Sequence, residues 1–299
     1  MKASIAVLAG TARPGFLLLT PVCVFLGIAA STEALREPAS YAWLLLALAG
    51  AVFAHMSVNM LNEYEDFTNG LDLRTERTPF SGGSGSLPEA PTSATLIRNA
   101  GALSLAITLV IGLVLVHYRG SALLPLGLLG LVLVGSYSTH IVRWPLASLI
   151  APGLGFGPLM VMGTSFVVSG HYSQAALVAS LVPLFLVSGL LLLNQFPDVE
   201  ADRSVGRSNL PIRLGRRRSS VVFALLLAAA YGSIAAGMMT GELPWAAAIA
   251  LLPGLGAPWL AVGVYRHADD VERLVPMLGW NVGLTLATPL LLGLGMLVA

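Results

Sequence analysis

Residues 121–137, SALLPLGLLGLVLVGSY, include no charged side chain and would be apolar on every face of a helix. VVFALLLAAAY at residues 221–231 has the same character. A membrane β-barrel would instead require short segments of alternating polarity. About 20 residues of this kind span the hydrocarbon core of a bilayer as a helix. Both stretches therefore predict membrane-spanning helices.

Similar apolar runs recur along all 299 residues, and we predict an all-α, polytopic membrane protein with nine spanning helices. The composition agrees, because 56% of residues are hydrophobic and only 10% are charged, whereas a soluble domain has about 25% charged residues. A net charge of +1 gives no attraction to nucleic acid. The predicted helices are residues 15–31, 41–62, 96–116, 121–140, 147–168, 175–196, 219–239, 245–264 and 275–298.

Arginine and lysine positions predict the orientation, since these residues are retained on the cytoplasmic side. Nine helices with the N terminus inside place all sixteen basic residues except Arg36 and Arg119 in the cytoplasm. We therefore expect a cytoplasmic N terminus, an external C terminus and a location in the cell membrane. A cleaved signal peptide over residues 1–31 is the competing interpretation, which Pro14 and Pro21 disfavour.

Acidic residues are as unevenly placed, and all but Glu33, Glu37 and Glu242 fall on the predicted cytoplasmic side. Two clusters begin within the ends of apolar helices: NMLNEYEDFTNGLD at residues 59–72 and NQFPDVEADRSVG at residues 194–206. The four-residue spacing stacks polar side chains on one helix face. Carboxylates at this depth are costly unless they bind a ligand.

Magnesium bridging to a phosphorylated ligand is the interpretation that accounts for both clusters. Mg²⁺ takes one or two protein carboxylates and completes its octahedron with water and substrate phosphate oxygens. Arginine then contacts the oxygens that face away from the metal. The alternative is that these residues are merely solvated helix ends, which the repeated spacing on one side of the membrane disfavours.

These two segments resemble the aspartate-rich motifs of the UbiA superfamily of intramembrane prenyltransferases. The residues 194–215, NQFPDVEADRSVGRSNLPIRLG, are similar to the second motif and its following loop. The residues 59–88 resemble the subgroup related to 1,4-dihydroxy-2-naphthoate prenyltransferase of menaquinone synthesis. The resemblance covers the whole chain and implies one integral-membrane domain over 1–299, in which nine helices surround a central cavity, with two pseudo-equivalent halves of about 1–140 and 141–299.

The resemblance also implies roles for particular residues. Glu63 stands where aspartate is commoner, and Gly70 replaces the last aspartate of the general pattern, whereas Asp72 matches the naphthoate subgroup. Arg143 would replace a lysine of the family, because Ile141 stands at the lysine position. The expected catalytic residues are Asp66, Asp198 and Asp202; the metal ligands are Asn62, Glu63, Asp66, Asp72, Asn194, Asp198 and Asp202; the diphosphate contacts are Arg13, Arg77 and Arg143; the acceptor contacts are His55, Asn59 and Tyr137.

The implied activity is transfer of a polyprenyl group from its diphosphate to an aromatic acceptor, such as a dihydroxynaphthoate-like quinone precursor, with Mg²⁺ as cofactor. Another aromatic ring or a polar lipid headgroup remains an alternative acceptor. A CDP-alcohol phosphotransferase is disfavoured because Asn194, where that motif needs glycine, lies four residues before Asp198. An ion-coupled transporter is disfavoured because the acids lie at helix ends and not near the midplane.

Overall fold

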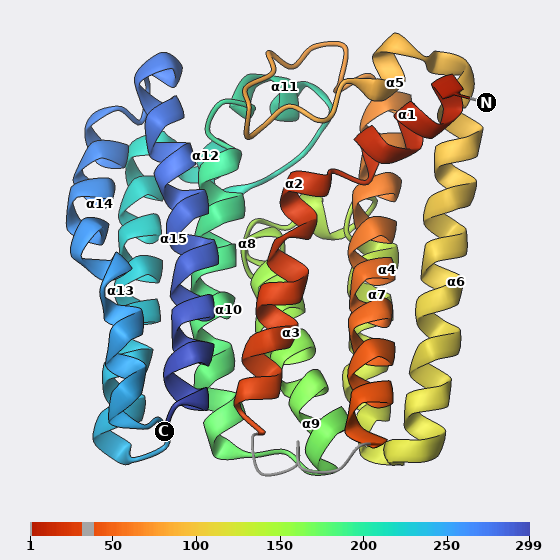
Figure 1. Cartoon of the computed structure of the whole chain (residues 1–299). Coiled ribbons are helices and arrows are strands. Elements are labelled where there is room, and N and C mark those ends of the chain that lie inside the picture. The colour runs from red at the N-terminus through yellow and green to blue at the C-terminus, as the bar shows by residue number, and fades with distance from the viewer. Residues whose placement is uncertain (1, 32–38) are drawn as a thin grey trace.

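The structure, a computed structural model, describes residues 2–31 and 39–299, and this part of the chain contains helices and turns but no strand. The long helices run side by side in one bundle (Figure 1). The all-helical prediction is therefore confirmed. The main helices are α1 (Lys2–Thr11), α2 (Pro14–Leu17), α3 (Leu19–Ala29), α4 (Ala39–Thr68), α5 (Ser86–Glu89), α6 (Ala94–Arg119), α7 (Leu124–Ser136), α8 (Pro145–Leu154), the π-helical η5 (Gly155–Met162), α9 (Gly163–Ser169), α10 (Gln174–Asn194), α11 (Val199–Ser204), α12 (Leu210–Leu214), α13 (Arg216–Thr240), the 3₁₀ helices η6 (Trp245–Leu251) and η7 (Pro253–Gly256), α14 (Ala257–Arg266) and α15 (Val271–Leu297).

Seven helical stretches in the described residues are long and apolar enough to cross a membrane. They match seven of the nine predicted segments. The predicted segment 15–31 forms one arm of a pair, Ser4–Thr11 and Pro14–Ala29, bent by 45°, and segment 121–140 contains a shorter apolar helix, Ser121–Ser136. The chain is a multi-pass membrane protein, while nine crossings and their orientation stay a prediction.

The break between α1 and α2 lies at Arg13. Its φ of +53° is left-handed, and among the described residues no other non-glycine residue has a positive φ. Pro14 occupies the start of α2. A backbone N–H at this position would have no acceptor within the helix, so proline, which lacks the N–H, loses no helical hydrogen bond there. α1 precedes the first predicted segment and crosses one end of the bundle instead of running along it (Figure 1). The hydropathy prediction does not include α1, because it identifies only segments that span the membrane.

The apolar core lies on the α10 side of the bundle. Val182, Leu186 and Leu193 of α10 pack into one buried cluster with Phe223 and Ile234 of α13. In contrast, Leu103 and Val110 of α6 are exposed and do not line the internal cavity, as expected for a helix that also faces lipid. The bundle is therefore filled by side chains on the α10, α13 and α15 side.

Two glycines bring the α8–η5 segment against α10. A Cβ at Gly153 would lie 2.1 Å from the carbonyl oxygen of Leu184, and one at Gly157 would lie 2.4 Å from that of Ser180. Real side chains do not approach backbone this closely, so only glycine fits. This is the close helix approach that small residues four apart permit in membranes.

Candidate active site

A cavity of about 470 Å³ lies between the helices on the α4 side. Its lining comes from α2, α3, α4, α6, α7, α8, η5, α9, α10, α11 and α15, together with residues of connecting segments that include the loops after α4, α10 and α11. Within the described chain, no residue of α13, η6 or α14 lines it. The arrangement of nine helices around a central cavity therefore stays a prediction, since α13 and α14 pack in the apolar core and do not reach this cavity.

The first acidic cluster ends α4. Asn62 and Asp66 line the cavity, and the chain then turns at Gly70, whose φ is +79°. The backbone N–H of Asp72 donates to the carbonyl oxygen of Asp66 at 3.2 Å, which returns Asp72 to the cavity wall. The glycine that replaces the family's last aspartate thus forms the turn that places the next one.

The second acidic cluster connects α10 to α11. Asn194 is the last residue of α10, and Asp198 and Asp202 lie one turn apart, with the Asp202 N–H donating to the Asp198 carbonyl at 2.8 Å. The Nδ2 of Asn209 donates to Asp202 Oδ2 at 2.7 Å. All four of these polar side chains line the same cavity as Asp66 and Asp72.

Arg207 joins the two clusters. Its Nη1 donates to Asp202 Oδ1 at 3.0 Å, and its Nη2 forms an ion pair with Asp66. Burial lowers the pKa of Arg207, but the carboxylates of Asp66 and Asp202 more than offset this and raise it, so the guanidinium stays charged. Sequence reasoning used this arginine only for orientation; its position five residues after Asp202 in the second motif was the available signal.

Glu63 differs from its expected place as a metal ligand. It is fully buried and does not line the cavity. Its Oε1 accepts hydrogen bonds from Arg13 Nε at 2.7 Å and from the Ser84 N–H at 2.8 Å, and its Oε2 accepts one from Ser84 Oγ at 2.7 Å. Both carboxylate oxygens are therefore engaged by protein groups.

The three residues expected to contact the diphosphate do not lie together in the structure. Arg13 lines the cavity, whereas Arg77 and Arg143 do not. Arg77 faces Glu89, with Nη1 and Oε1 3.8 Å apart, and Arg143 is exposed to solvent in a short 3₁₀ turn. Arg77 still lies close enough to Asp72 for its charge to lower the pKa of that carboxyl group, although burial raises it more. Arg207 is the second arginine that lines the cavity beside Arg13.

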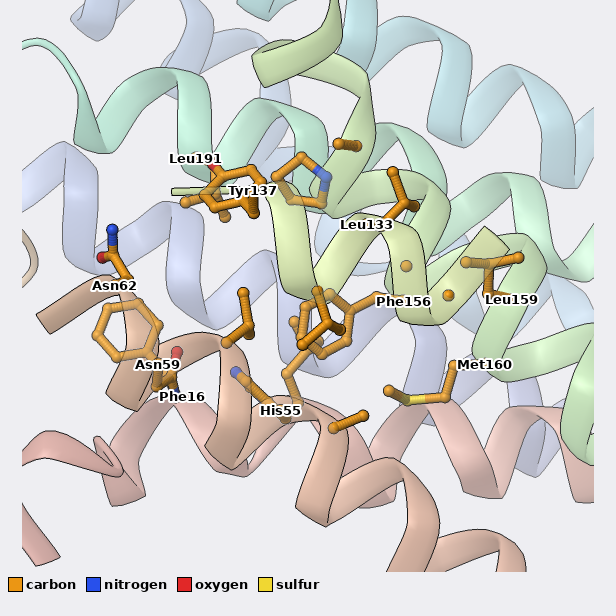
Figure 2. Close-up of a pocket in the computed structure, with 18 of the residues that line it drawn as sticks. Phe16, His55, Asn59, Asn62, Leu133, Tyr137, Phe156, Leu159, Met160 and Leu191 are labelled. Carbon is orange, nitrogen blue, oxygen red and sulfur yellow. The ribbon is translucent and has the colours of Figure 1, made fainter. Parts of the chain in front are cut away.

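The three expected acceptor contacts all line the cavity (Figure 2). His55 lies deeper along α4, where its Nδ1 is 2.8 Å from Thr20 Oγ1 and its ring meets Phe156 edge to face at 4.8 Å. Asn59 Nδ2 donates to the carbonyl oxygen of Ala12 at 2.9 Å. Tyr137 follows α7, so polar and aromatic side chains from α4 and from the end of α7 line the same cavity.

The donor set fits Mg²⁺ shared with a phosphate better than a closed metal cage. In residues 2–31 and 39–299, no three His, Cys, Asp or Glu side chains form a group that could enclose a metal ion. However, Asp72 Oδ2, Asn194 Oδ1 and Asp198 Oδ1 are buried without hydrogen-bond partners. Buried acceptors of this kind normally have partners. Mg²⁺ typically takes few protein oxygens and adds water and substrate phosphate, which these three orphaned oxygens would suit.

Two carboxyl groups of this set also hold protons easily. Burial, reinforced by Glu63 and Asp66, raises the pKa of Asp72 to about 7. Burial, reinforced by Asp202, raises the pKa of Asp198 to about 7. Both charged forms are therefore costly without a nearby cation.

The structure is a multi-pass helical bundle with carboxylates and arginines gathered at one end of an apolar cavity, a site that could hold a ligand with a charged head and an apolar body. Comparison with known proteins gives the family. The chain belongs to the UbiA prenyltransferase family, which matches residues 18–283. It is accordingly a prenyltransferase, and the resemblance predicted from the two motifs is confirmed. This membership decides against the phosphotransferase and transporter alternatives.

Curated relatives carry a more specific name. The 1,4-dihydroxy-2-naphthoate octaprenyltransferase of Haemophilus influenzae is 25% identical over 292 residues, covering 96% of this chain and 94% of that protein. The protein of the same name from Bacillus subtilis is 24% identical over 205 residues, covering 67% of this chain. That match spans 64% of the Bacillus protein, slightly less than two thirds of its length.

Solved structures share the fold. An apo UbiA homologue from Aeropyrum pernix K1 aligns with a TM-score of 0.65 and 22% identity, over 96% of this chain and 98% of that one. A UbiA homologue from Archaeoglobus fulgidus, bound to DMAPP and Mg²⁺, aligns with a TM-score of 0.60 and 15% identity, over 98% and 99%.

Proposed function

We propose that the protein transfers a polyprenyl group from its diphosphate to an aromatic acceptor, such as a dihydroxynaphthoate-like quinone precursor, and that it requires Mg²⁺. One observation carries the proposal: the acids of two distant segments and the guanidinium of Arg207 meet at one end of an apolar cavity. A prenyl diphosphate matches this cavity at both ends, because its charged diphosphate suits the polar end and its hydrocarbon tail suits the apolar part. The names of the relatives support the naphthoate-like acceptor.

The acidic residues hold the metal in this proposal. Asn62, Asp66 and Asp72 from the first motif and Asn194, Asp198 and Asp202 from the second would provide the oxygens. Bound Mg²⁺ supplies charge neutralisation of the diphosphate, which makes it a better leaving group. The Mg²⁺ and DMAPP bound to the Archaeoglobus homologue are consistent with this assignment.

The cationic residues orient the leaving group. Arg13 and Arg207 line the cavity on the acid-bearing side and would donate to diphosphate oxygens. As the allylic C–O bond breaks, negative charge grows on the diphosphate and positive charge on the prenyl carbon. Donors fixed beforehand stabilise that separation without reorganisation at the moment of reaction.

The apolar wall protects the cation. Leu133, Phe156, Leu159 and Met160 line the cavity, which would keep water from the allylic carbocation until an electron-rich ring carbon attacks it (Figure 2). The new C–C bond forms there, and the attacked ring carbon then loses a proton or, in a carboxylated acceptor, the carboxyl group as CO₂, which restores aromaticity. His55, Asn59 and Tyr137 line the same space, so we assign them to the acceptor.

The proposed location is the cell membrane, with the site open to the cytoplasm. The arginine distribution supports this orientation because the acid clusters lie on the arginine-rich side. A water-soluble diphosphate head would then reach the site from the cytoplasm, while its tail enters from the bilayer.

Product analysis tests the proposed reaction. Detergent-purified protein is incubated with Mg²⁺, prenyl diphosphates of several lengths, and three acceptors: dihydroxynaphthoate, a hydroxybenzoate and a glycerol phosphate lipid. Mass spectrometry should find a prenylated aromatic product that disappears when EDTA removes the metal. Prenylation of the glycerol lipid alone, or no product from a folded sample, would contradict the proposal.

A further inference from the structure

Glu63 occupies a motif position where the family resemblance implies a metal ligand, yet it lies behind the cavity wall. We propose that Glu63 is a positioning residue that fixes Arg13 and the loop segment 82–85, and that it does not bind magnesium. This inference rests on the proposed prenyl diphosphate reaction. Its first support is that Glu63 is fully buried and absent from the cavity lining, whereas Asp66, one turn later, is present there.

The contacts of Glu63 leave no simple place for a metal ion. The hydrogen bonds from Arg13 Nε and from the Ser84 N–H and Oγ occupy both oxygens at 2.7–2.8 Å. Arg13 Nη2 lies 2.5 Å from Oε1 as well. A divalent cation at Glu63 would have to displace these donors and sit beside the Arg13 charge, which opposes its binding. The carboxylate is therefore neutralised by protein alone.

The first group that Glu63 fixes is Arg13. Arg13 lies at the break between α1 and α2 with φ +53°, a conformation that the surrounding structure must stabilise. Asn59, one turn before Glu63 on α4, donates to the carbonyl oxygen of Ala12 at 2.9 Å. Asn59 and Glu63 lie on one face of α4 and hold both the backbone and the side chain of this break. The Arg13 guanidinium thereby stays at the cavity.

The second group is the glycine-containing loop. Ser84 is bonded to Glu63 through its backbone and side chain, while Gly82 and Gly83 beside it line the cavity. A Cβ at Gly83 would lie 2.8 Å from Asp72 Oδ1, so this backbone passes directly against a proposed metal ligand. Holding Ser84 therefore holds the loop next to Asp72.

Glu63→Gln separates positioning from metal binding when compared with Asp66→Asn, a loss of charge one turn along the same helix. Glu63→Gln removes the carboxylate charge that holds Arg13. This should raise the KM for prenyl diphosphate by about 10-fold or more, because the charge-assisted hydrogen bond between Arg13 and residue 63 is lost. The Mg²⁺ concentration for half-maximal activity should change by less than about 2-fold. Asp66→Asn should raise that concentration strongly.

Glu63→Asp gives an independent test, since it keeps the charge and donor atoms but shortens the side chain. A metal ligand would tolerate this change, because aspartate is the commoner residue of the motif. If the side chain instead positions Ser84 and Arg13, the shorter aspartate cannot reach both of them. The KM for prenyl diphosphate should then rise as it does in Glu63→Gln. Near-normal KM in Glu63→Asp would contradict the positioning role.

A readout without turnover is the rise in melting temperature caused by Mg²⁺ with inorganic diphosphate. We expect the Mg²⁺ concentration that gives half of this rise to match wild type in Glu63→Gln and to increase in Asp66→Asn. Should Glu63→Gln not fold, Ser84→Ala removes the loop contact alone and should raise KM with an unchanged Mg²⁺ requirement. The inference would be overturned if Glu63→Gln raised the Mg²⁺ requirement as much as Asp66→Asn does. The proposed function alone would be overturned if the wild-type protein bound Mg²⁺ and diphosphate but made no prenylated product.

Discussion

At the scale of single residues, Arg207 connects carboxylates that lie far apart in sequence. It ion-pairs with Asp66, 141 residues earlier, and with Asp202 in its own motif. A guanidinium with two terminal nitrogens can bridge two carboxylates and later present the same donors to a diphosphate. We therefore assign diphosphate binding to Arg207 and Arg13, and not to Arg143.

Arg207→Ala should raise the KM for prenyl diphosphate by about 10-fold or more, since one charged hydrogen-bonding group leaves the site. Arg143→Ala is the matched control, because Arg143 is an exposed arginine outside the cavity lining and its loss should change KM by less than about 2-fold. Steady-state kinetics with each substrate varied in turn measure both effects. Equal KM changes in the two variants would remove Arg207 from the proposed site.

The pKa values of Asp72 and Asp198 predict how Mg²⁺ binding depends on pH. Both pKa values are raised to about 7, so near neutrality each carboxyl group is about half protonated when no metal is bound. Mg²⁺ binds the ionised form, and each proton must leave first. Affinity should therefore rise from pH 6 to pH 8, by at most about 10-fold per pH unit for each proton released, and level off above pH 8.

Calorimetric titration of detergent-purified protein with Mg²⁺ and inorganic diphosphate at several pH values measures this dependence. The titration of diphosphate itself is subtracted with a protein-free control. In Asp198→Asn the affinity should be weaker and its pH dependence shallower. Affinity that stays flat between pH 6 and pH 8 in the wild type would show that these carboxyl groups do not take up the metal.

The sequence predicted which acids would gather, but not which protein groups would hold them. Asp66, Asp198 and Asp202 follow a four-residue spacing that can be read locally, and the structure places them around one cavity. The roles of Glu63 and Arg207 depend on loops that return to the helix ends, through Ser84 in one case and Asp66 in the other. Contacts between residues so far apart in the sequence produce no local spacing pattern from which they could be predicted.

At the scale of helices, the α8–η5 segment depends on glycines to approach α10. Gly157→Ala should lower thermal stability, because its Cβ would lie 2.4 Å from the Ser180 carbonyl oxygen and the helices must separate. The expected loss is about 1–3 kcal/mol of unfolding free energy. Gly155→Ala is the control on the same element, since a Cβ there meets nothing within 4 Å. Thermal unfolding in one detergent compares them, and equal melting temperatures would contradict this packing.

Hydropathy predicted the long helices better than the irregular ones. Apolar length alone identifies α10 and α15, whose predicted ranges overlap nearly all of their observed extents. It missed α1, which crosses the end of the bundle, and it extended the 121–140 segment beyond α7, which ends at Ser136. Breaks at Arg13 and after Ser136 depend on caps and tertiary contacts, and not on mean hydropathy.

At the scale of the whole molecule, the arginine distribution predicts which end of the bundle faces the cytoplasm. The loop before α5 and the C-terminal end of α15 lie at opposite ends of the bundle (Figure 1). A reporter inserted near Ser84 should therefore be cytoplasmic, and one fused after Ala299 should be outside. Compartment-specific reporter activity tests this topology, and two reporters on one side would show that the predicted number of crossings is wrong.

Acids from two distant segments of the sequence would together form one magnesium and diphosphate site. The arrangement of two pseudo-equivalent halves, 1–140 and 141–299, remains a proposal, yet Arg207 and Asp66 show that the two motifs meet. If one site performs the reaction, then an acid from either motif must be essential. Asp198 is the decisive residue because its Oδ1 is buried without a hydrogen-bond partner and its side chain faces the cavity.

The most direct measurement is the turnover of Asp198→Asn with saturating prenyl diphosphate, acceptor and Mg²⁺. We expect a loss of more than about 100-fold, comparable to removal of one strong group that stabilises the transition state. Folding should survive, since Asp198 Oδ1 has no hydrogen-bond partner to lose and asparagine keeps an oxygen that can accept from the Gly82 N–H. A melting curve of the purified variant checks this. Turnover within a factor of about two of wild type, in a folded sample, would contradict the single-site account.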